Sequence, residues 1–293
     1  MPGCGGPGYG GADVDIRSPR SPIRPIASTC IARRRGVAGS RRMSHTCWIT
    51  SGPHSHDGVD VDGADRLPGE PRATGFLGRL PPTTRQEVLD HGRPRRYEPG
   101  DRILREGDRD RHVILLTSGF VKVTTHIEGI EALVAIRGAG DIVGEAAALS
   151  DQPRMASVIA CGTVTARLVT AEAFGTVLIR YPDVARLVTI TLAERLRWAN
   201  DRRADFVAFP VEVRLARVLV EISVRFGRRA AHEAVAIDVP LSQRELATMV
   251  GASEDTVQKA LRALRRAGLI HSTYRRLTVL DPAGLRRMSR HVR

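Results

Sequence analysis

The sequence has few cysteines, and no two of them are placed to act together. Cys4, Cys30, Cys47 and Cys161 are the only four among 293 residues, and no C-x-x-C spacing occurs. Disulfide frameworks and structural zinc sites need several cysteines at close, regular spacing. We therefore expect neither a disulfide framework nor a zinc site in this protein.

Long apolar runs are also missing. The strongly apolar runs, of which residues 113–116 are an example, are far shorter than the roughly 20 residues that cross a bilayer as a helix. The N-terminal residues include arginines but lack the apolar core and small-residue cleavage site of a secretion signal. We therefore expect a cytoplasmic protein without a membrane partner.

The common sequence signatures of catalysis are absent as well. The chain contains no phosphate-loop lysine motif, no nucleophile elbow and no sequence cluster of metal ligands. One enzyme alternative is a nucleotide hydrolase that uses Glu145 and histidines, and its turnover would be lost on Glu145→Ala. We expect the protein not to be an enzyme and to require no cofactor.

Lysine is nearly absent, so the basic character comes from arginine. Only Lys122 and Lys259 are lysines, and the net charge is +13. The charge is +3 over residues 1–72, +2 over residues 73–207 and +8 over residues 208–293. Because neutralising phosphates supplies most sequence-independent DNA affinity, the C-terminal part suits duplex binding. The alternative is a basic surface that only keeps the protein soluble.

The first two segments differ in composition and period. Residues 1–72 are rich in Gly, Pro, Ser, Arg and Asp without a helical or strand period, which predicts a disordered tail, with Met43 as a possible internal start. Residues 73–182 contain short β-rich runs separated by glycine turns, for example at residues 102–104, 113–116 and 121–125. Such spacing is typical of a small sandwich or barrel.

A long amphipathic helix is predicted next, over residues 183–207. Pro182 and Pro210 stand near its two ends, and its apolar side chains recur at intervals of three and four residues. They are Val184, Leu187, Val188, Leu192, Leu196, Ala199 and Phe206. This stripe needs a partner surface, which either the β-rich domain or the same helix of a second chain can supply.

The strongest local pattern is a helix-turn-helix within residues 208–284. Ser242 with Glu245 forms a capping box, Gly251 ends the first helix and Ser253 caps the second. Residues 269–280 then predict a hairpin wing, and residues 285–293 a basic tail. The exposed N-terminal part of the second helix is expected to enter the major groove. The predicted DNA-binding residues are Ser242, Gln243, Ser253, Glu254, Asp255, Thr256, Gln258, Lys259 and Arg262.

Residues 140–158 form a second motif, GDIVGEAAALSDQPRMASV. A short helix that starts after Gly144 offers backbone amides to a phosphate, and Arg154 adds a charge-assisted hydrogen bond. Together with the helix-turn-helix, this motif resembles the family of the cyclic-AMP receptor protein and the fumarate-nitrate regulator (Crp/Fnr) over residues 75–284. The motif is similar to the family's phosphate-binding cassette.

The resemblance implies an α+β fold. It consists of an N-terminal cyclic-nucleotide-binding-like β-roll, a long dimerisation helix and a C-terminal winged helix-turn-helix. It also implies a homodimeric transcription regulator that binds a palindromic operator in double-stranded DNA, with RNA polymerase as a further partner. In this arrangement the effector binds between the roll and the long helix and changes the relative position of the two recognition helices. The alternative is a nonspecific nucleic-acid binder, which would show no preference among random duplexes.

Cyclic AMP or cyclic GMP is the candidate effector. In family members that bind cyclic AMP, the residue that matches Glu145 holds the ribose, and the residue that matches Arg154 holds the phosphate. The predicted ligand-binding residues are Gly144, Glu145, Ala146, Arg154, Met155, Ala156 and Asn200. Met155 replaces a hydroxyl residue of the family, and Ala199-Asn200 replaces a Thr-Ser pair. Two alternatives stay open: another small effector, or no ligand at all, with Glu145 and Arg154 paired to each other.

Other sensing chemistries have weaker support in the sequence. An iron-sulphur sensor of this family needs clustered N-terminal cysteines, which this chain lacks. A haem sensor would have His112 and His126 as candidate ligands. On the recognition helix, Glu254 stands where family members often have arginine, so we expect a different operator with Gln258 and Lys259 reading purines.

Overall fold

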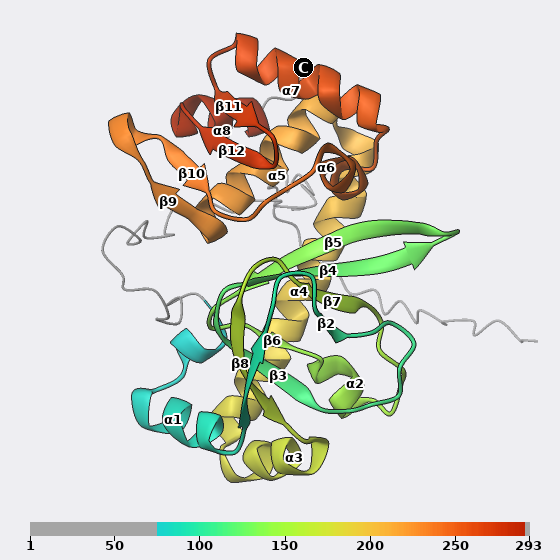
Figure 1. Ribbon diagram of the computed structural model, residues 1–293, viewed down its shortest axis with the longest axis vertical. Helices are drawn as coiled ribbons and strands as arrows, with labels where there is room; N and C mark the ends of the chain where they lie inside the picture. Colours follow the sequence, from blue (N-terminus) through green and yellow to red (C-terminus); the bar gives the residue numbers. More distant parts are fainter. Residues whose placement is uncertain (1–74, 291–293) are drawn as a thin grey trace, which may run out of the picture. The chain divides into compact units, whose positions relative to one another are not determined.

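The computed structural model describes residues 75–290, and its N-terminal half is a β-roll of two antiparallel four-stranded sheets (Figure 1). The strand orders are β1-β8-β3-β6 and β2-β7-β4-β5. The strands are β1 (Arg93–Tyr97), β2 (Arg102–Leu104), β3 (Val113–Ser118), β4 (Phe120–Ile127), β5 (Ile130–Gly138), β6 (Ile142–Val143), β7 (Ser157–Ala160) and β8 (Val164–Val169). The helices are η1 (Leu77–Arg79), α1 (Pro82–Asp90), α2 (Glu145–Leu149) and α3 (Ala171–Arg180). Residues 1–72, which we expected to be a disordered tail, lie outside the described residues.

Strand β3 explains the apolar run noticed in the sequence. Its side chains alternate between the two faces of the sheet, and both faces are covered. Ile114 and Leu116 belong to the core between the two sheets, whereas Val113 and Leu115 belong to a second core that includes buried residues of α1, α3 and α4. A strand buried on both faces is apolar throughout rather than alternately polar.

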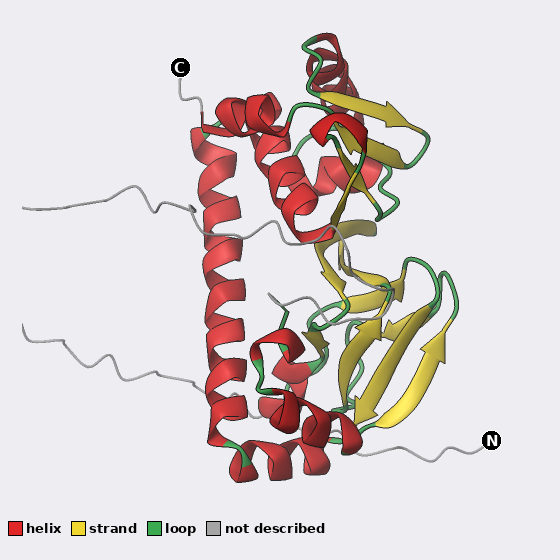
Figure 2. Ribbon diagram, turned by 90° about the vertical axis from the view of Figure 1, so that its left-hand side faces the viewer, coloured by secondary structure: helices red, strands yellow, loops and turns green. Residues whose placement is uncertain are grey.

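Helix α4 (Pro182–Ala208) follows the roll as one uninterrupted helix (Figure 2). Proline at the first helical position suits this start, because that amide has no intrahelical acceptor. Val184, Leu187 and Val188 are buried in the core of the roll, but Leu196 is 63% exposed and Val207 91% exposed. The roll therefore covers only the first part of the predicted apolar stripe.

The C-terminal half is a winged helix-turn-helix with its own core, and its four-stranded sheet has the order β11-β12-β10-β9. The helices are α5 (Val211–Phe226), η2 (Ala231–Glu233), α6 (Gln243–Val250), α7 (Glu254–Arg266) and α8 (Pro282–Arg290). The strands are β9 (Gly227–Arg229), β10 (Val235–Ile237), β11 (Ile270–Thr273) and β12 (Arg276–Val279). The predicted α+β architecture is confirmed.

The expectation of a basic tail over residues 285–293 is wrong for residues 285–290. These residues belong to α8, which packs on α5. Leu285 is fully buried, and Met288, three residues later, packs against the same core. The carboxylate of Asp281 accepts the amide of Gly284 at 2.7 Å and so satisfies a free donor at the helix start. Packing of Leu285 and Met288 in the core therefore determines the structure of this segment, although arginines dominate its composition.

Candidate effector pocket and nucleic-acid interface

The cassette is built around a glycine with a left-handed backbone. Gly144, at φ +85°, joins β6 to α2, and a Cβ there would lie 2.6 Å from Nη1 of Arg154 and 3.0 Å from the carbonyl of His112. A side chain at this position would therefore be strained and would also push the arginine away. The glycine that the sequence singled out brings Arg154 against the start of α2.

Arg154 is buried, with a relative exposure of 4%, and all three guanidinium nitrogens have partners. Nε donates to Oδ1 of Asp110 at 2.9 Å, Nη1 to the carbonyl of Gly144 at 2.8 Å and Nη2 to the carbonyl of His112 at 2.7 Å. The other carboxylate oxygen of Asp110 lies 2.9 Å from Nδ1 of His112. Burial lowers the pKa of His112, against the opposing effect of Asp110. Arg154 thus fastens the loop before β3 to the cassette.

Glu145 is also buried, at 3% exposure, and it pairs with Arg195 of α4 rather than with Arg154. Arg195 additionally donates to the carbonyl of Ile142 at 2.6 Å, so it joins α4 to the cassette. The alternative in which Glu145 and Arg154 pair with each other is therefore wrong, because each has its own partner on a different element. The second carboxylate oxygen of Glu145, Oε2, is buried without a hydrogen-bond partner.

The remaining predicted ligand residues differ in their exposure. Ala146 and Ala156 are partly buried, Met155 is 73% exposed, and Asn200 is exposed on α4. Sequence reasoning missed Asp110 and Arg195. Arg195 lies at helical spacing from Leu192 and Ala199, on the apolar stripe predicted for the long helix. A charged residue in such a stripe could have indicated a buried partner of opposite charge. Asp110 stands in a turn rich in charged residues, where nothing in the sequence marks one carboxylate over another.

The helix-turn-helix has the capping that the sequence predicts. The hydroxyl of Ser242 accepts the amide of Glu245 at 3.2 Å, and Oε2 of Glu245 accepts the amide of Ser242 at 2.8 Å. Gly251 has φ +59°, and Ser253 accepts the amide of Thr256 at 3.3 Å. Both helices of the motif therefore begin with a hydroxyl cap, and the turn between them uses glycine's left-handed conformation.

Helix α7 separates an inner apolar face from an outer polar face. Val257, Leu261 and Leu264 are buried in the C-terminal core. Five side chains of the helix that are predicted to contact DNA are exposed and have no hydrogen-bond or ion-pair partner among residues 75–290; they are Glu254, Asp255, Gln258, Lys259 and Arg262. Of the other predicted contacts, Gln243 and Ser253 are exposed, whereas Ser242 and Thr256 are partly buried. The outer face is therefore free to contact base edges and phosphates.

The first helix of the motif also contacts the β4–β5 hairpin. Nζ of Lys122 lies 2.7 Å from Oε1 of Glu245 and donates to the carbonyl of Pro240 at 2.6 Å. The amide of Leu133 donates to the hydroxyl of Thr248 at 3.0 Å. Burial raises the pKa of Glu245, but hydrogen bonds from Lys122 and Ser242 outweigh burial and lower it. The carboxylate of Glu245 therefore both caps α6 and forms the ion pair with Lys122 of the roll.

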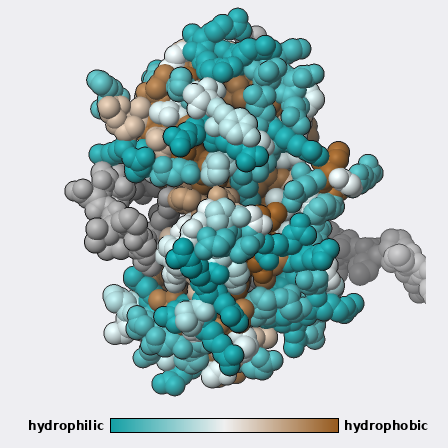
Figure 3. All heavy atoms as spheres, viewed as in Figure 1, coloured by the Kyte–Doolittle hydropathy of each residue, from teal (hydrophilic) through white to brown (hydrophobic). Residues whose placement is uncertain are grey.

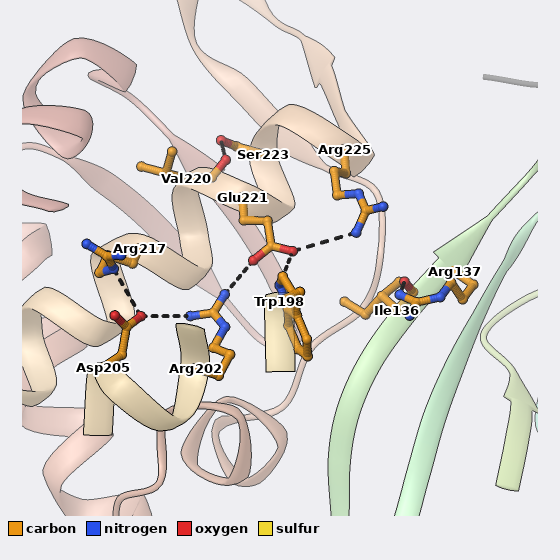
Figure 4. A network of polar contacts seen from close by, with 10 residues as sticks. All are labelled: Ile136, Arg137, Trp198, Arg202, Asp205, Arg217, Val220, Glu221, Ser223 and Arg225. Carbon is orange, nitrogen blue, oxygen red and sulfur yellow. Dashed lines mark hydrogen bonds and ion pairs between the residues drawn. The ribbon is translucent and has the colours of Figure 1, made fainter. Parts of the chain in front are cut away.

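A buried carboxylate connects the long helix to the DNA-binding domain. Asp205 of α4 is 5% exposed; its Oδ2 accepts from Nε of Arg217 on α5 at 3.0 Å and lies 3.9 Å from Nη1 of Arg202 (Figure 4). Two cations from different helices share this one anion. The connection between α4 and α5 is therefore electrostatically fixed.

A second carboxylate extends this network. Glu221 of α5 accepts the indole N–H of Trp198 at 2.7 Å, pairs with Arg202 and lies 3.7 Å from Nη1 of Arg225 (Figure 4). The guanidinium of Arg202 also lies over the Trp198 ring, 5.2 Å from its centroid. Side chains near the end of α4 therefore contact the first helix of the winged domain directly.

Each of the two histidines considered as a sensor ligand lies beside a carboxylate. Nδ1 of His126 lies 3.3 Å from Oε2 of Glu106, and His112 contacts Asp110. Burial raises the pKa of the Cys161 thiol to about 11. Within residues 75–290 no group of three His, Cys, Asp or Glu side chains is arranged to hold a metal ion, and no helix is long and apolar enough to cross a membrane.

The surface of the molecule is mainly hydrophilic in the view of Figure 3, with apolar side chains in separate patches. One patch lies at the free end of the β4–β5 hairpin, where Ile127 and Ile130 are 60% and 51% exposed. On α4, Leu196, Phe206 and Val207 are also exposed. Apolar side chains grouped on a long helix and on a protruding hairpin are candidates for contact with another chain.

Comparison with known proteins agrees with both halves of the fold. Residues 94–181 match the cyclic nucleotide-binding domain, and residues 213–288 match the Crp-like helix-turn-helix domain. The chain is 30% identical over 185 residues to the cyclic AMP receptor protein of Thermus thermophilus, covering 62% of this chain and 82% of that protein. The chain belongs to the CRP/FNR family. As a CRP/FNR protein it is a DNA-binding transcription regulator with a cyclic nucleotide-binding domain.

Other CRP/FNR proteins match over a similar span. The CRP-like cAMP-activated global transcriptional regulator of Mycobacterium tuberculosis is 29% identical over 217 residues, which cover 74% of this chain and 96% of that protein. A solved structure of a CRP/FNR-family transcriptional regulator from Thermus thermophilus superimposes with a TM-score of 0.58 at 23% identity, over 68% of this chain and 99% of that one. The second match concerns the fold alone.

Proposed function

We propose that this CRP/FNR protein is a homodimer that binds a palindromic DNA operator and that a cyclic nucleotide modulates this binding. The observation that carries the DNA-binding part is the outer face of α7, where five side chains predicted to contact DNA are exposed and have no partner within the described part of the chain. A recognition helix with free donors and acceptors at its N-terminal end can read base edges in the major groove.

Dimerisation is supported by the uncovered part of α4. Leu196 and Val207 expose apolar surface beyond the part of the helix that the roll covers. Pairing this stripe with its twin would bury that surface and bring two recognition helices together. Half-sites on DNA must then lie about one helical turn, roughly 34 Å, apart. We propose RNA polymerase as a further partner and the cytoplasm as the location of the protein.

Titration of a duplex selected from a random pool tests this function. We expect the selected site to be palindromic and to bind two chains. Gln258→Ala should weaken binding to the selected site by about 1–3 kcal/mol, because one base-edge contact is lost, and should leave binding to random duplex unchanged. Lys259→Ala should also weaken binding to the selected site by about 1–3 kcal/mol, because Lys259 is expected to read a purine.

A matched control for these variants is Arg290→Ala, an exposed arginine at the end of α8 that is not part of the recognition helix. The proposal is contradicted if the selected pool shows no symmetry, if the protein stays monomeric at micromolar concentration, or if Gln258→Ala weakens all duplexes equally. The last result would indicate the nonspecific nucleic-acid binder.

The cyclic nucleotide is proposed from the chemistry of the cassette. Arg154 is a buried cation at the start of a helix, and Glu145 has a buried oxygen without a partner. A cyclic phosphate would accept from Arg154, and a ribose hydroxyl would donate to Oε2 of Glu145. Because Asp110 now holds Arg154, the phosphate has to displace a carboxylate. Met155 offers no hydroxyl to help, so we expect weak binding.

Isothermal calorimetry of the full chain with cyclic AMP and cyclic GMP tests the effector. We expect micromolar binding that Arg154→Ala abolishes, because the main cation for the phosphate is removed. Arg154→Lys serves as a second variant, since it keeps the charge and should retain part of the affinity. Thermal unfolding of each variant separates loss of the ligand contact from loss of the fold. Binding unchanged in Arg154→Ala would contradict the assignment.

A second candidate function is a ligand-independent regulator. The observation in its favour is that Arg154 has three internal acceptors and Glu145 has Arg195. If no cyclic nucleotide produces heat and the protein still binds its selected duplex, this second function is the correct one.

A further inference from the structure

Arg137 of β5 is a cation without a matching anion. Its Nη1 donates to the carbonyl of the preceding residue, Ile136, at 2.9 Å, and no carboxylate of residues 75–290 lies within ion-pair distance. In Figure 4 no dashed line joins it to the carboxylates of the α4–α5 network. Part of the residue is accessible to solvent, so a ligand can reach it.

The surroundings of Arg137 favour an incoming hydrogen-bond acceptor. Burial, together with the neighbouring charges of Arg195 and Arg225, lowers the pKa of Arg137 to about 9, against the opposing effect of Asp141 and Glu145. Arginine nevertheless stays protonated at neutral pH. Oδ2 of Asp141 accepts the amide of Gly138 at 2.9 Å, and Glu145 pairs with Arg195. The positive charge is therefore only partly compensated, and an acceptor-rich group would stabilise it.

The position of Arg137 relative to the cassette suggests which part of a ligand it meets. Asp141 accepts the amide of Gly138, the residue after Arg137. Arg195 donates to the carbonyl of Ile142, the residue after Asp141, and pairs with Glu145. These contacts connect Arg137 to the Glu145 end of the cassette. In a cyclic nucleotide the ribose carries the phosphate on one side and the base on the other. With the phosphate at Arg154 and the ribose at Glu145, the base would extend toward Arg137 and Arg195.

We propose that Arg137 selects the base of the effector, by donating two hydrogen bonds to O6 and N7 of a guanine ring. This inference rests on the proposed cyclic-nucleotide function and adds a preference within it. A guanidinium matches the two adjacent acceptors of guanine, whereas adenine presents N7 beside an amino donor that opposes it. The preferred effector is therefore a guanine cyclic nucleotide.

Calorimetric titration of the full chain with cyclic GMP, cyclic AMP and cyclic IMP tests the proposal. Hypoxanthine keeps O6 and N7 but lacks the 2-amino group, so cyclic IMP isolates the edge that Arg137 reads. We expect cyclic GMP and cyclic IMP to bind at least tenfold more tightly than cyclic AMP. In Arg137→Leu the three affinities should lie within about a factor of two, mainly through weaker binding of cyclic GMP and cyclic IMP.

Two further variants make the result specific. Arg137→Gln offers one donor and one acceptor, which match N7 and the 6-amino group of adenine, so it should shift the preference toward cyclic AMP, even if the leucine variant folds poorly. Arg102→Leu removes an exposed arginine of β2 and should keep the full preference. Thermal unfolding reports the fold of each variant.

The outcomes distinguish the two levels of the argument. The role of Arg137 is overturned if the wild type binds all three nucleotides with equal affinity or prefers cyclic AMP. It is also overturned if Arg137→Leu and Arg137→Gln leave the preference of the wild type unchanged. None of these results contradicts the proposed function. Cyclic IMP behaving like cyclic AMP also overturns the role of Arg137, because the 2-amino group would then be what is read. No binding of any nucleotide, by protein that binds DNA, overturns both.

Discussion

Asp110→Asn is expected to tighten cyclic nucleotide binding about fivefold to tenfold. In the wild type the carboxylate of Asp110 occupies Nε of buried Arg154 at 2.9 Å, so a cyclic phosphate competes with an internal anion. Asparagine keeps a hydrogen-bond acceptor but removes the charge. A hydrogen bond to a charged group contributes about 1 kcal/mol more than a neutral one, which corresponds to that change in affinity. Calorimetric titration measures it directly.

The matched control is Asp108→Asn, on the same loop. Asp108 accepts the amide of Arg154 through its backbone carbonyl, at 2.8 Å, and its side chain is exposed. This variant removes a negative charge near the site without touching the guanidinium, so its affinity should stay within twofold of the wild type. An equal gain in both variants would mean that net charge, rather than competition for Arg154, sets the affinity. No gain in affinity in Asp110→Asn would contradict the hypothesis that Asp110 competes with the phosphate for Arg154.

Asp205→Ala is expected to lower the free energy of unfolding by about 3 kcal/mol. The substitution leaves Arg202 and Arg217 without their shared buried anion, and breaking a buried pair from one side costs about 3–5 kcal/mol. The lower end applies because the Arg217 side chain is 37% exposed and Arg202 keeps Glu221. Urea unfolding followed by circular dichroism measures this loss.

Asp201→Ala, one turn earlier on α4 and exposed, is the control and should change stability by less than about 0.5 kcal/mol. Asp205→Asn should lie between the two, since it keeps an acceptor for Nε of Arg217. A loss in Asp205→Ala as small as that in Asp201→Ala would show that the network adds no stability, because solvent then screens both cations.

The part of this structure that the sequence predicts best is local. Ser242, Glu245, Gly251 and Ser253 determine where α6 and α7 begin and end, because caps and left-handed turns depend on neighbours within a few residues. The apolar run at residues 113–116 likewise predicts a strand, which is β3. These features follow from residue type and spacing, and the fold contains them.

The prediction of a basic tail over residues 285–293 failed because it considered only the local composition. Charge dominates the composition of that segment, but two apolar residues at helical spacing, Leu285 and Met288, are enough to anchor α8 on α5. Whether such a short apolar pair forms a helix depends on the presence of a receiving surface, which lies some 70 residues earlier in the chain.

The electrostatic partners of the candidate site were beyond the sequence. The motif singled out Glu145 and Arg154, and pairing them with each other was a reasonable alternative. The fold instead gives Arg154 to Asp110, 44 residues earlier, and Glu145 to Arg195, 50 residues later. Composition and spacing determined the two domains, the recognition helix and the cassette. Tertiary structure alone decided which charges meet, because ion pairs depend on distances between atoms that sequence separation does not measure.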